Sequence, residues 1–190
     1  MVRKDLHDTD AANYRWTDSQ LDRHIEHALA EVSAAMPQEK TATLAVTPGS
    51  RDLSLTSLTD LIEVEAVEYP LLQYPPSYAG FSAWGTTLTF ESDVSPTGGN
   101  AKLYYAARHV LDGSGTTLSP FQVEMTVAGA AAYASLEQSA HTTDRLTTGG
   151  GAVPERYAAY ARARLTAFQQ LLYQYGRKNR VRRRRMYVPA

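Results

Sequence analysis

The spacing of apolar residues changes twice along the chain, and this change constrains the fold more than any other feature. From Leu21 to Met36 apolar residues recur at the spacing of one helical face, and Pro37 ends the run. From about residue 41 the spacing favours strands, and after residue 119 it favours helices again. Helices that bracket strands predict an α+β fold, a small bundle of three main helices with a β-rich insertion after the first.

Local signals predict where these helices begin and end. Thr17 and Gln20 have the spacing of a capping box, and Trp16 can pack on Leu21, which predicts a first helix over 17–36. Ser119 and Gln122 repeat the pattern ahead of a helix rich in Ala and Gly. A third helix follows a TTGGGAVP linker at 147–154, and Gly176 is predicted to end it. Its apolar stripe comprises Tyr157, Ala161, Leu165, Phe168, Leu172 and Tyr175.

The middle of the chain predicts strands at 41–47, 61–70, 86–92 and 101–110. Alternation in the second of these places Ile62, Val64 and Ala66 on one face. Residues 71–85 are rich in Pro, Gly and aromatic side chains, so we expect a structured loop there.

These elements predict three parts of the chain. Residues 1–15 are polar and are expected to form a flexible arm that orders on a partner. Residues 16–176 are expected to form one domain, with the helical bundle at 16–37 and 119–176 and the β-rich insertion at 40–112. Residues 177–190 are expected to form a basic tail.

Composition excludes several classes of protein. The chain has no cysteine, which excludes disulfides and thiolate metal sites. No run approaches the roughly 20 apolar residues of a membrane span, and the first residues lack a signal-peptide core, so we expect synthesis in the cytoplasm.

Candidate chemistry is sparse. His24, His27 and Glu31 have a spacing that suits a metal, although a solvated helix face is the simpler interpretation. Glu63, Glu65 and Glu68 line one strand, and we expect a charged edge or a contact to a basic neighbour rather than acid–base catalysis. No nucleophile elbow, phosphate loop or dinucleotide fingerprint is present, so we expect no enzyme activity, no cofactor and no metal.

The charge distribution is the strongest functional signal. Residues 177–190 hold seven of the nineteen basic side chains, and the other 176 residues carry twelve basic and twenty acidic side chains, a formal charge of −8. A short apolar stretch follows the arginines, as a protein-docking peptide requires, whereas a tail that only contacts nucleic acid has no need of it. The predicted docking residues are Arg177, Lys178, Arg180, Arg182, Arg183, Arg184, Arg185, Met186, Tyr187, Val188 and Pro189.

Twelve tyrosines against four phenylalanines favour half-buried surfaces such as subunit interfaces. The candidates for packing between subunits are Tyr74, Tyr78, Phe81, Trp84, Tyr133, Tyr157 and Tyr160.

The layout resembles that of head–tail connector proteins of tailed bacteriophages, the adaptor or head-completion proteins. The resemblance covers roughly residues 14–190 and is carried by RWTDSQLDRHIEHALAEVSAAMP, VEYPLLQYPPSYAGFSAWGTTLTF, VAGAAAYASLEQ and the final helix with its basic extension. The better-known adaptors are mostly helical, so the β-rich insertion departs from them.

The resemblance implies a structural protein of the virion neck, in a ring of usually twelve copies beneath the portal. Such a ring extends the DNA channel without sequence specificity, carries a stopper or tail-terminator protein, and sends its C-terminal segment into the portal. Two alternatives stay open. One is a DNA-binding packaging or regulatory factor that uses the tail as a phosphate clamp, and the other is a tail-tube or baseplate protein.

Overall fold

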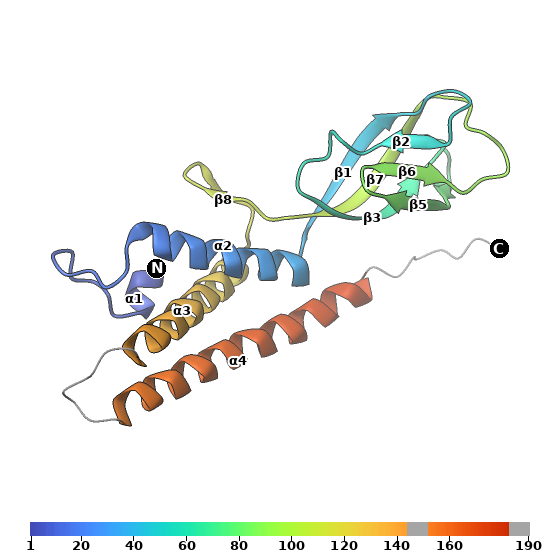
Figure 1. Ribbon diagram of the computed structural model, residues 1–190. Helices are drawn as coiled ribbons and strands as arrows, with labels where there is room; N and C mark the ends of the chain where they lie inside the picture. The colour runs from blue at the N-terminus through green and yellow to red at the C-terminus, as the bar shows by residue number, and fades with distance from the viewer. Residues whose placement is uncertain (144–151, 183–190) are drawn as a thin grey trace. The chain divides into compact units, whose positions relative to one another are not determined.

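The computed structural model describes residues 1–143 and 152–182, with the backbone alone at 141–143, 152–154, 156–157 and 177–182. The described chain is a mixed α+β protein with antiparallel sheets, which confirms the predicted class. It divides into two compact units (Figure 1). Pro37–His109 form a β unit, and the residues on either side form a helical unit. Residues 110–112, expected within the insertion, therefore belong to the helical unit.

The described residues of the helical unit form four helices and a short hairpin. The helices are α1 (Val2–Asp5), α2 (Asp18–Ala35), α3 (Pro120–Thr143) and α4 (Ala152–Arg182), and the hairpin pairs β8 (Leu111–Asp112) with β9 (Gly115–Thr116). Both predicted capping boxes are present. Gln20 N–H donates to Thr17 Oγ1 and Thr17 N–H to Gln20 Oε1, while Ser119 N–H donates to Gln122 Oε1 over 2.8 Å.

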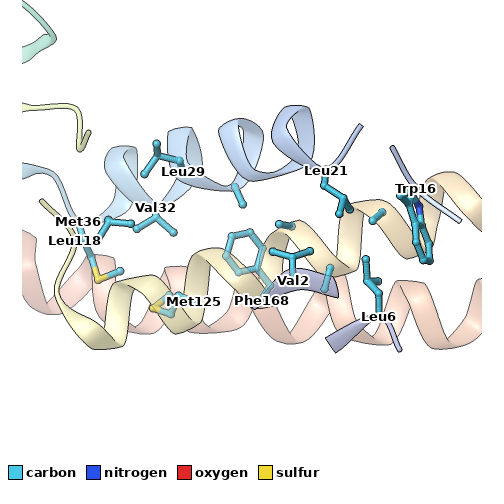
Figure 2. Close-up of a cluster of buried hydrophobic side chains, with 14 residues drawn as sticks. Val2, Leu6, Trp16, Leu21, Leu29, Val32, Met36, Leu118, Met125 and Phe168 are labelled. Atoms are coloured by element: carbon cyan, nitrogen blue, oxygen red, sulfur yellow. The ribbon is translucent and has the colours of Figure 1, made fainter. Parts of the chain in front are cut away.

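The core of the helical unit lies between α2, α3 and α4, with α1 packed on it (Figure 2). Phe168 of α4 is 1% exposed and sits among side chains from the other helices. A Cβ at Gly129 of α3 would lie 2.6 Å from Phe168 Cζ, so the small residue is what allows α3 and α4 to approach there. Trp16 and Leu21 are buried in the same core, as the proposed helix staple requires.

The N-terminal residues are not a free arm, and that prediction is wrong. Val2 and Leu6 are both 7% exposed because they pack into the helical core. Arg3 Nη1 lies 2.6 Å from Asp8 Oδ2, and its Nη2 lies 2.6 Å from Asp18 Oδ1 at the start of α2. Burial of Val2 and Leu6 and the ion pairs of Arg3 thus hold the mostly polar N-terminal segment against the helical unit.

The β unit consists of two antiparallel sheets around its own core. The first has the strand order β1-β7-β3-β4 and the second β2-β6-β5. Leu88, Leu103 and Val67 are fully buried between them. The strands are β1 (Gln38–Ala45), β2 (Asp52–Ser54), β3 (Leu61–Glu68), β4 (Tyr78–Ala79), β5 (Phe81–Trp84), β6 (Thr87–Phe90) and β7 (Asn100–Ala107).

Two sequence expectations for the β unit are wrong. Register shifts at Leu61/Glu63 and Val64/Ala66 break the expected alternation in β3, so that Val64 and Val67 are buried while Ile62 is 47% exposed. Residues 71–85 are not all loop, since β4 and β5 lie at their end and pair with β3 and β6. Short strands beside glycine carry too little alternation to stand out in a sequence.

The last helix does not stop at Gly176, which corrects the predicted boundary between domain and tail. The helix continues through Gly176 to Arg182. Gly176 is buried, and a Cβ there would lie 3.2 Å from the Ala35 carbonyl oxygen at the end of α2. Glycine in a helix interior costs only about 1 kcal/mol, and here it permits close helix packing instead of ending the helix. The predicted 147–154 linker is also shorter than expected, because α4 begins at Ala152.

Candidate interaction site

The predicted docking segment starts on α4. The backbone from Arg177 to Arg182 is helical, whereas 183–190 lie outside the described residues. α4 is held to the helical core by Phe168, Leu172 and Tyr175, and the Tyr175 ring lies 4.5 Å from that of Phe121. The basic segment therefore begins on a helix whose preceding residues pack against the helical core.

Of the predicted subunit-packing residues whose side chains are described, Tyr74 and Trp84 are the most exposed. Tyr74 is 98% and Trp84 90% exposed, and both belong to the β unit. Leu72, which sequence reasoning missed, is fully exposed beside Tyr74. Residues 70–90, which include all three, contain no charged side chain. Large apolar side chains that a fold leaves uncovered mark candidate interaction surfaces.

Other predicted packing residues are used within their own unit. Phe81 is half-buried against the β core, and Tyr78 packs on Tyr104 with ring centroids 6.2 Å apart. Tyr160 is 56% exposed and lies beside Arg164 of the same helix. The side chain of Tyr157 lies outside the described residues.

Tyr133 is a contact between α2 and α3 and not a free surface residue. Its ring stacks on His27 with centroids 4.2 Å apart, and its hydroxyl donates to Glu31 Oε1 over 2.7 Å. Burial raises the pKa of the Tyr133 hydroxyl well above its usual value, and the Glu31 carboxylate raises it further. His27 and Glu31 thus hold α3 on α2.

His24 is buried in the same contact between helices, which corrects its expected place on a solvated face. Its Nε2 hydrogen bonds to Glu137 Oε2 of α3, and Arg23 Nη2 lies 2.6 Å from the same oxygen. Burial alone would raise the pKa of Glu137, but the bonds from Arg23 and His24 outweigh it, and the pKa lies below its ordinary value. A buried histidine with a carboxylate partner holds the helices together here.

The three glutamates of β3 do not form one charged edge. β3 pairs with β7 along its length and with β4 at one end, so the strand is interior at Glu68. Tyr104 Oη donates to Glu68 Oε2 over 2.9 Å across the strand pair. Burial, together with that carboxylate, raises the pKa of Tyr104 to about 12. Glu63 and Glu65 also make interactions within the protein.

Other kinds of site are not evident among residues 1–143 and 152–182. There, no three His, Cys, Asp or Glu side chains converge as a metal site would need. Within the same residues, no helix has the length and apolarity to cross a bilayer.

An apolar pocket in the helical unit was not predicted from sequence. It holds about 400 Å³ and is lined by α1, the first turns of α2, the start of α3 and Leu111 of β8. Residues from four separated segments line it, and the periodicity of a sequence does not show which segments pack together.

No protein-family model matches the chain, and no curated protein matches it.

Proposed function

We propose that this protein is a structural connector in the neck of a tailed bacteriophage, forming a ring beneath the portal and joining head to tail. The observation that carries the proposal is the charge distribution around α4. Seven of nineteen basic side chains follow Gly176, while the other 176 residues have a formal charge of −8. The segment begins on a helix anchored to the helical core by Phe168 and Leu172.

A ring needs two different contact surfaces on each subunit. The uncharged, exposed side chains Leu72, Tyr74 and Trp84 of the β unit supply one candidate surface. Twelve copies would place twelve tails against the portal, and many weak contacts made together give a firm joint. An acidic body suits a channel wall along which DNA slides. The downstream partner would be a stopper or tail-terminator protein.

A DNA-binding packaging or regulatory factor is the second candidate, and the same cationic segment favours it. Arginines that clamp phosphates release counterions, so the affinity falls steeply with salt. Seven contacts predict a slope of log affinity on log salt of about −6. Docking to the portal predicts strong portal binding, and DNA binding that is weak at physiological salt.

The deciding experiment compares the full chain with a variant in which Arg182–Arg185 are replaced by Gln. We expect the full chain to sediment with portal rings of the same phage and the variant to lose most of that binding. Arg162→Gln, at an exposed position of α4, is the control and should bind normally. If neither protein sediments with portal rings, while DNA affinity falls with each lost charge, the phosphate clamp is the function.

A further inference from the structure

The apolar pocket of the helical unit is lined mostly by apolar side chains, and the two carboxylates on the first turns of α2 are called its acidic end here. The apolar lining includes Val2, Leu21, Ile25, Leu118, Val123 and Val127. Asp18 and Asp22, one turn apart on α2, line the same pocket. Its volume of about 400 Å³ lies in the range of pockets that bind small molecules or peptide side chains.

The net charge at the acidic end is negative. Two cationic groups also line the pocket, the Met1 α-amino group and the Arg3 guanidinium, which is shared between Asp8 and Asp18 and lies 3.7 Å from the centre of the Tyr14 ring. They stand against three carboxylates, those of Asp8, Asp18 and Asp22. Asp22 is exposed, and it has no ion-pair partner among the residues whose side chains the structure describes. An occupant with cations beside apolar side chains would match this surface.

The chain contains one segment of that composition. Arg182–Arg185 are followed directly by Met186, Tyr187, Val188 and Pro189. The exposed apolar side chains of the β unit are a poorer match, because residues 70–90 carry no charge. Charge complementarity therefore favours the C-terminal segment as the occupant.

The segment that fills a given pocket belongs to another copy. α4 runs alongside α2 in the same direction, because Arg164 reaches Asp5 near the start of α2 while Gly176 contacts Ala35 at its end. At 1.5 Å per residue, Arg182 lies on the order of 29 Å along the axis from Asp22. The four residues from Arg182 to Met186 span at most about 14 Å. Met186 therefore does not reach the acidic end of its own pocket.

We propose that this pocket binds residues 182–190 of a second copy of the chain, with Met186–Pro189 in the apolar interior and the arginines at Asp18 and Asp22. This goes beyond the proposed function, because it concerns the protein before any portal is present. A tail held in this way is unavailable to other acidic surfaces, and a portal must compete for it. Assembly is thereby coupled to release of the tail.

The test is titration of full-length protein into a fluorescent peptide of residues 177–190, followed by anisotropy. A second peptide carries Ser at Met186, Tyr187 and Val188 and keeps every charge. We expect the second peptide to bind about tenfold more weakly, a loss of about 1.4 kcal/mol. Equal binding of the two peptides would mean that the acidic body attracts cations without a pocket, and would overturn the proposal.

Matched protein variants locate the site. Leu111→Asn alters the pocket wall, whereas Val110→Asn changes the adjacent exposed residue outside it. Asp22→Asn removes a charge at the pocket, whereas Glu26→Gln removes one from α2 outside it. We expect several-fold weaker peptide binding for Leu111→Asn and Asp22→Asn, and unchanged binding for the two controls. Equal losses in both members of each pair would refute the assignment.

A photo-crosslinking residue in place of Tyr187 of the peptide gives a readout independent of affinity. Adducts on α2, α3 or β8 support the pocket, and adducts confined to the β unit overturn it. None of these measurements involves a portal. Refuting the pocket proposal therefore does not refute the connector function, and refuting the connector function does not refute the pocket proposal.

Discussion

At the residue scale, the contact between α2 and α3 depends on polar side chains within an otherwise apolar packing. His24 is 7% exposed and shares the Glu137 carboxylate with Arg23, while Tyr133 bonds to Glu31 about two turns farther along α2. Each partner fixes how the two helices are aligned, because shifting one helix by a turn would leave a buried donor without its acceptor. The polar hydrogen bonds thus fix the axial alignment of α2 and α3, which apolar packing alone would leave less defined.

Glu137→Gln should lower stability at neutral pH by roughly 1 to 2 kcal/mol, since the buried His24 loses a charged acceptor. Because the carboxylate is 39% exposed, solvent screening limits the contribution of the ion pair. The pKa of Glu137 is depressed in the folded protein, so its contribution is present above the ordinary value of 4.5 and is lost as the pH falls below it.

Chemical denaturation at pH 7 and near pH 3 measures this effect. The gap between wild type and Glu137→Gln should be largest at pH 7 and should narrow at low pH. Glu26→Gln, at an exposed position of α2, serves as the control. A gap that is the same at both pH values would show that the carboxylate charge does not contribute.

At the element scale, the sequence predicts a helix boundary reliably where a local motif marks it and less reliably where packing decides it. Thr17 with Gln20 and Ser119 with Gln122 form the hydrogen bonds that their spacing predicts, because a capping box is a local motif. The predicted helix end at Gly176 was wrong because it depends on a contact with Ala35, which is distant in sequence. That contact makes the glycine a site of close helix packing instead of a helix end.

The candidate sites divide in the same way. The charge asymmetry of the tail and the aromatic content of 70–90 can be read from the sequence directly. The burial of His24 and the pocket near Asp22 depend on which helices meet, and periodicity gives a helix its apolar face without naming its neighbour. The bulges in β3 are likewise set by pairing with β7.

Thr17→Ala tests whether the cap defines the start of α2. The substitution removes the acceptor for Gln20 N–H and should cost on the order of 1 kcal/mol. Thermal unfolding of Thr17→Ala and Thr17→Ser compares the loss of the cap with its retention. Identical midpoints for alanine, serine and wild type would mean that the packing of Trp16 and Leu21 alone fixes the helix start.

At the scale of the whole molecule, the β unit is a continuous insertion in a discontinuous helical unit. Each unit has its own buried core. The β unit enters at Gln38 and leaves at Ala107, and these residues are paired partners in β1 and β7. Strand partners lie about 5 Å apart, so the chain enters and leaves the unit at nearly one point, an arrangement that tolerates excision.

Residues 37–109 expressed alone should therefore fold. We expect a cooperative unfolding transition and dispersed amide signals from a β-sheet protein, measured by circular dichroism and NMR. The complementary chain, with 37–109 replaced by a short Gly-Ser linker, should keep its helical content. Loss of cooperativity in both pieces would show that the two cores depend on each other.

Truncation of the tail separates folding from function most sharply, and the helix end at Arg182 changes how the truncation must be designed. A chain cut after Arg182 keeps α4 whole, whereas one cut after Gly176 also removes its last helical residues. Both truncated chains keep Tyr175 and Gly176, which are the most C-terminal core contacts of α4 among the residues whose side chains the structure describes. Both truncated chains should therefore unfold within about 0.5 kcal/mol of wild type, while binding to portal rings should be lost in both.

Two smaller changes then separate charge from apolar contact. Replacing Arg182–Arg185 by Gln should slow association and weaken the joint, because a desolvated charge lost at an interface costs roughly 2 to 5 kcal/mol. Removing only 186–190 should weaken portal binding and leave DNA affinity almost unchanged, since phosphate contacts need only the cations. If removal of the apolar residues does not affect assembly, while the Gln series loses DNA affinity in proportion to charge, then the tail clamps phosphates and is not a docking peptide.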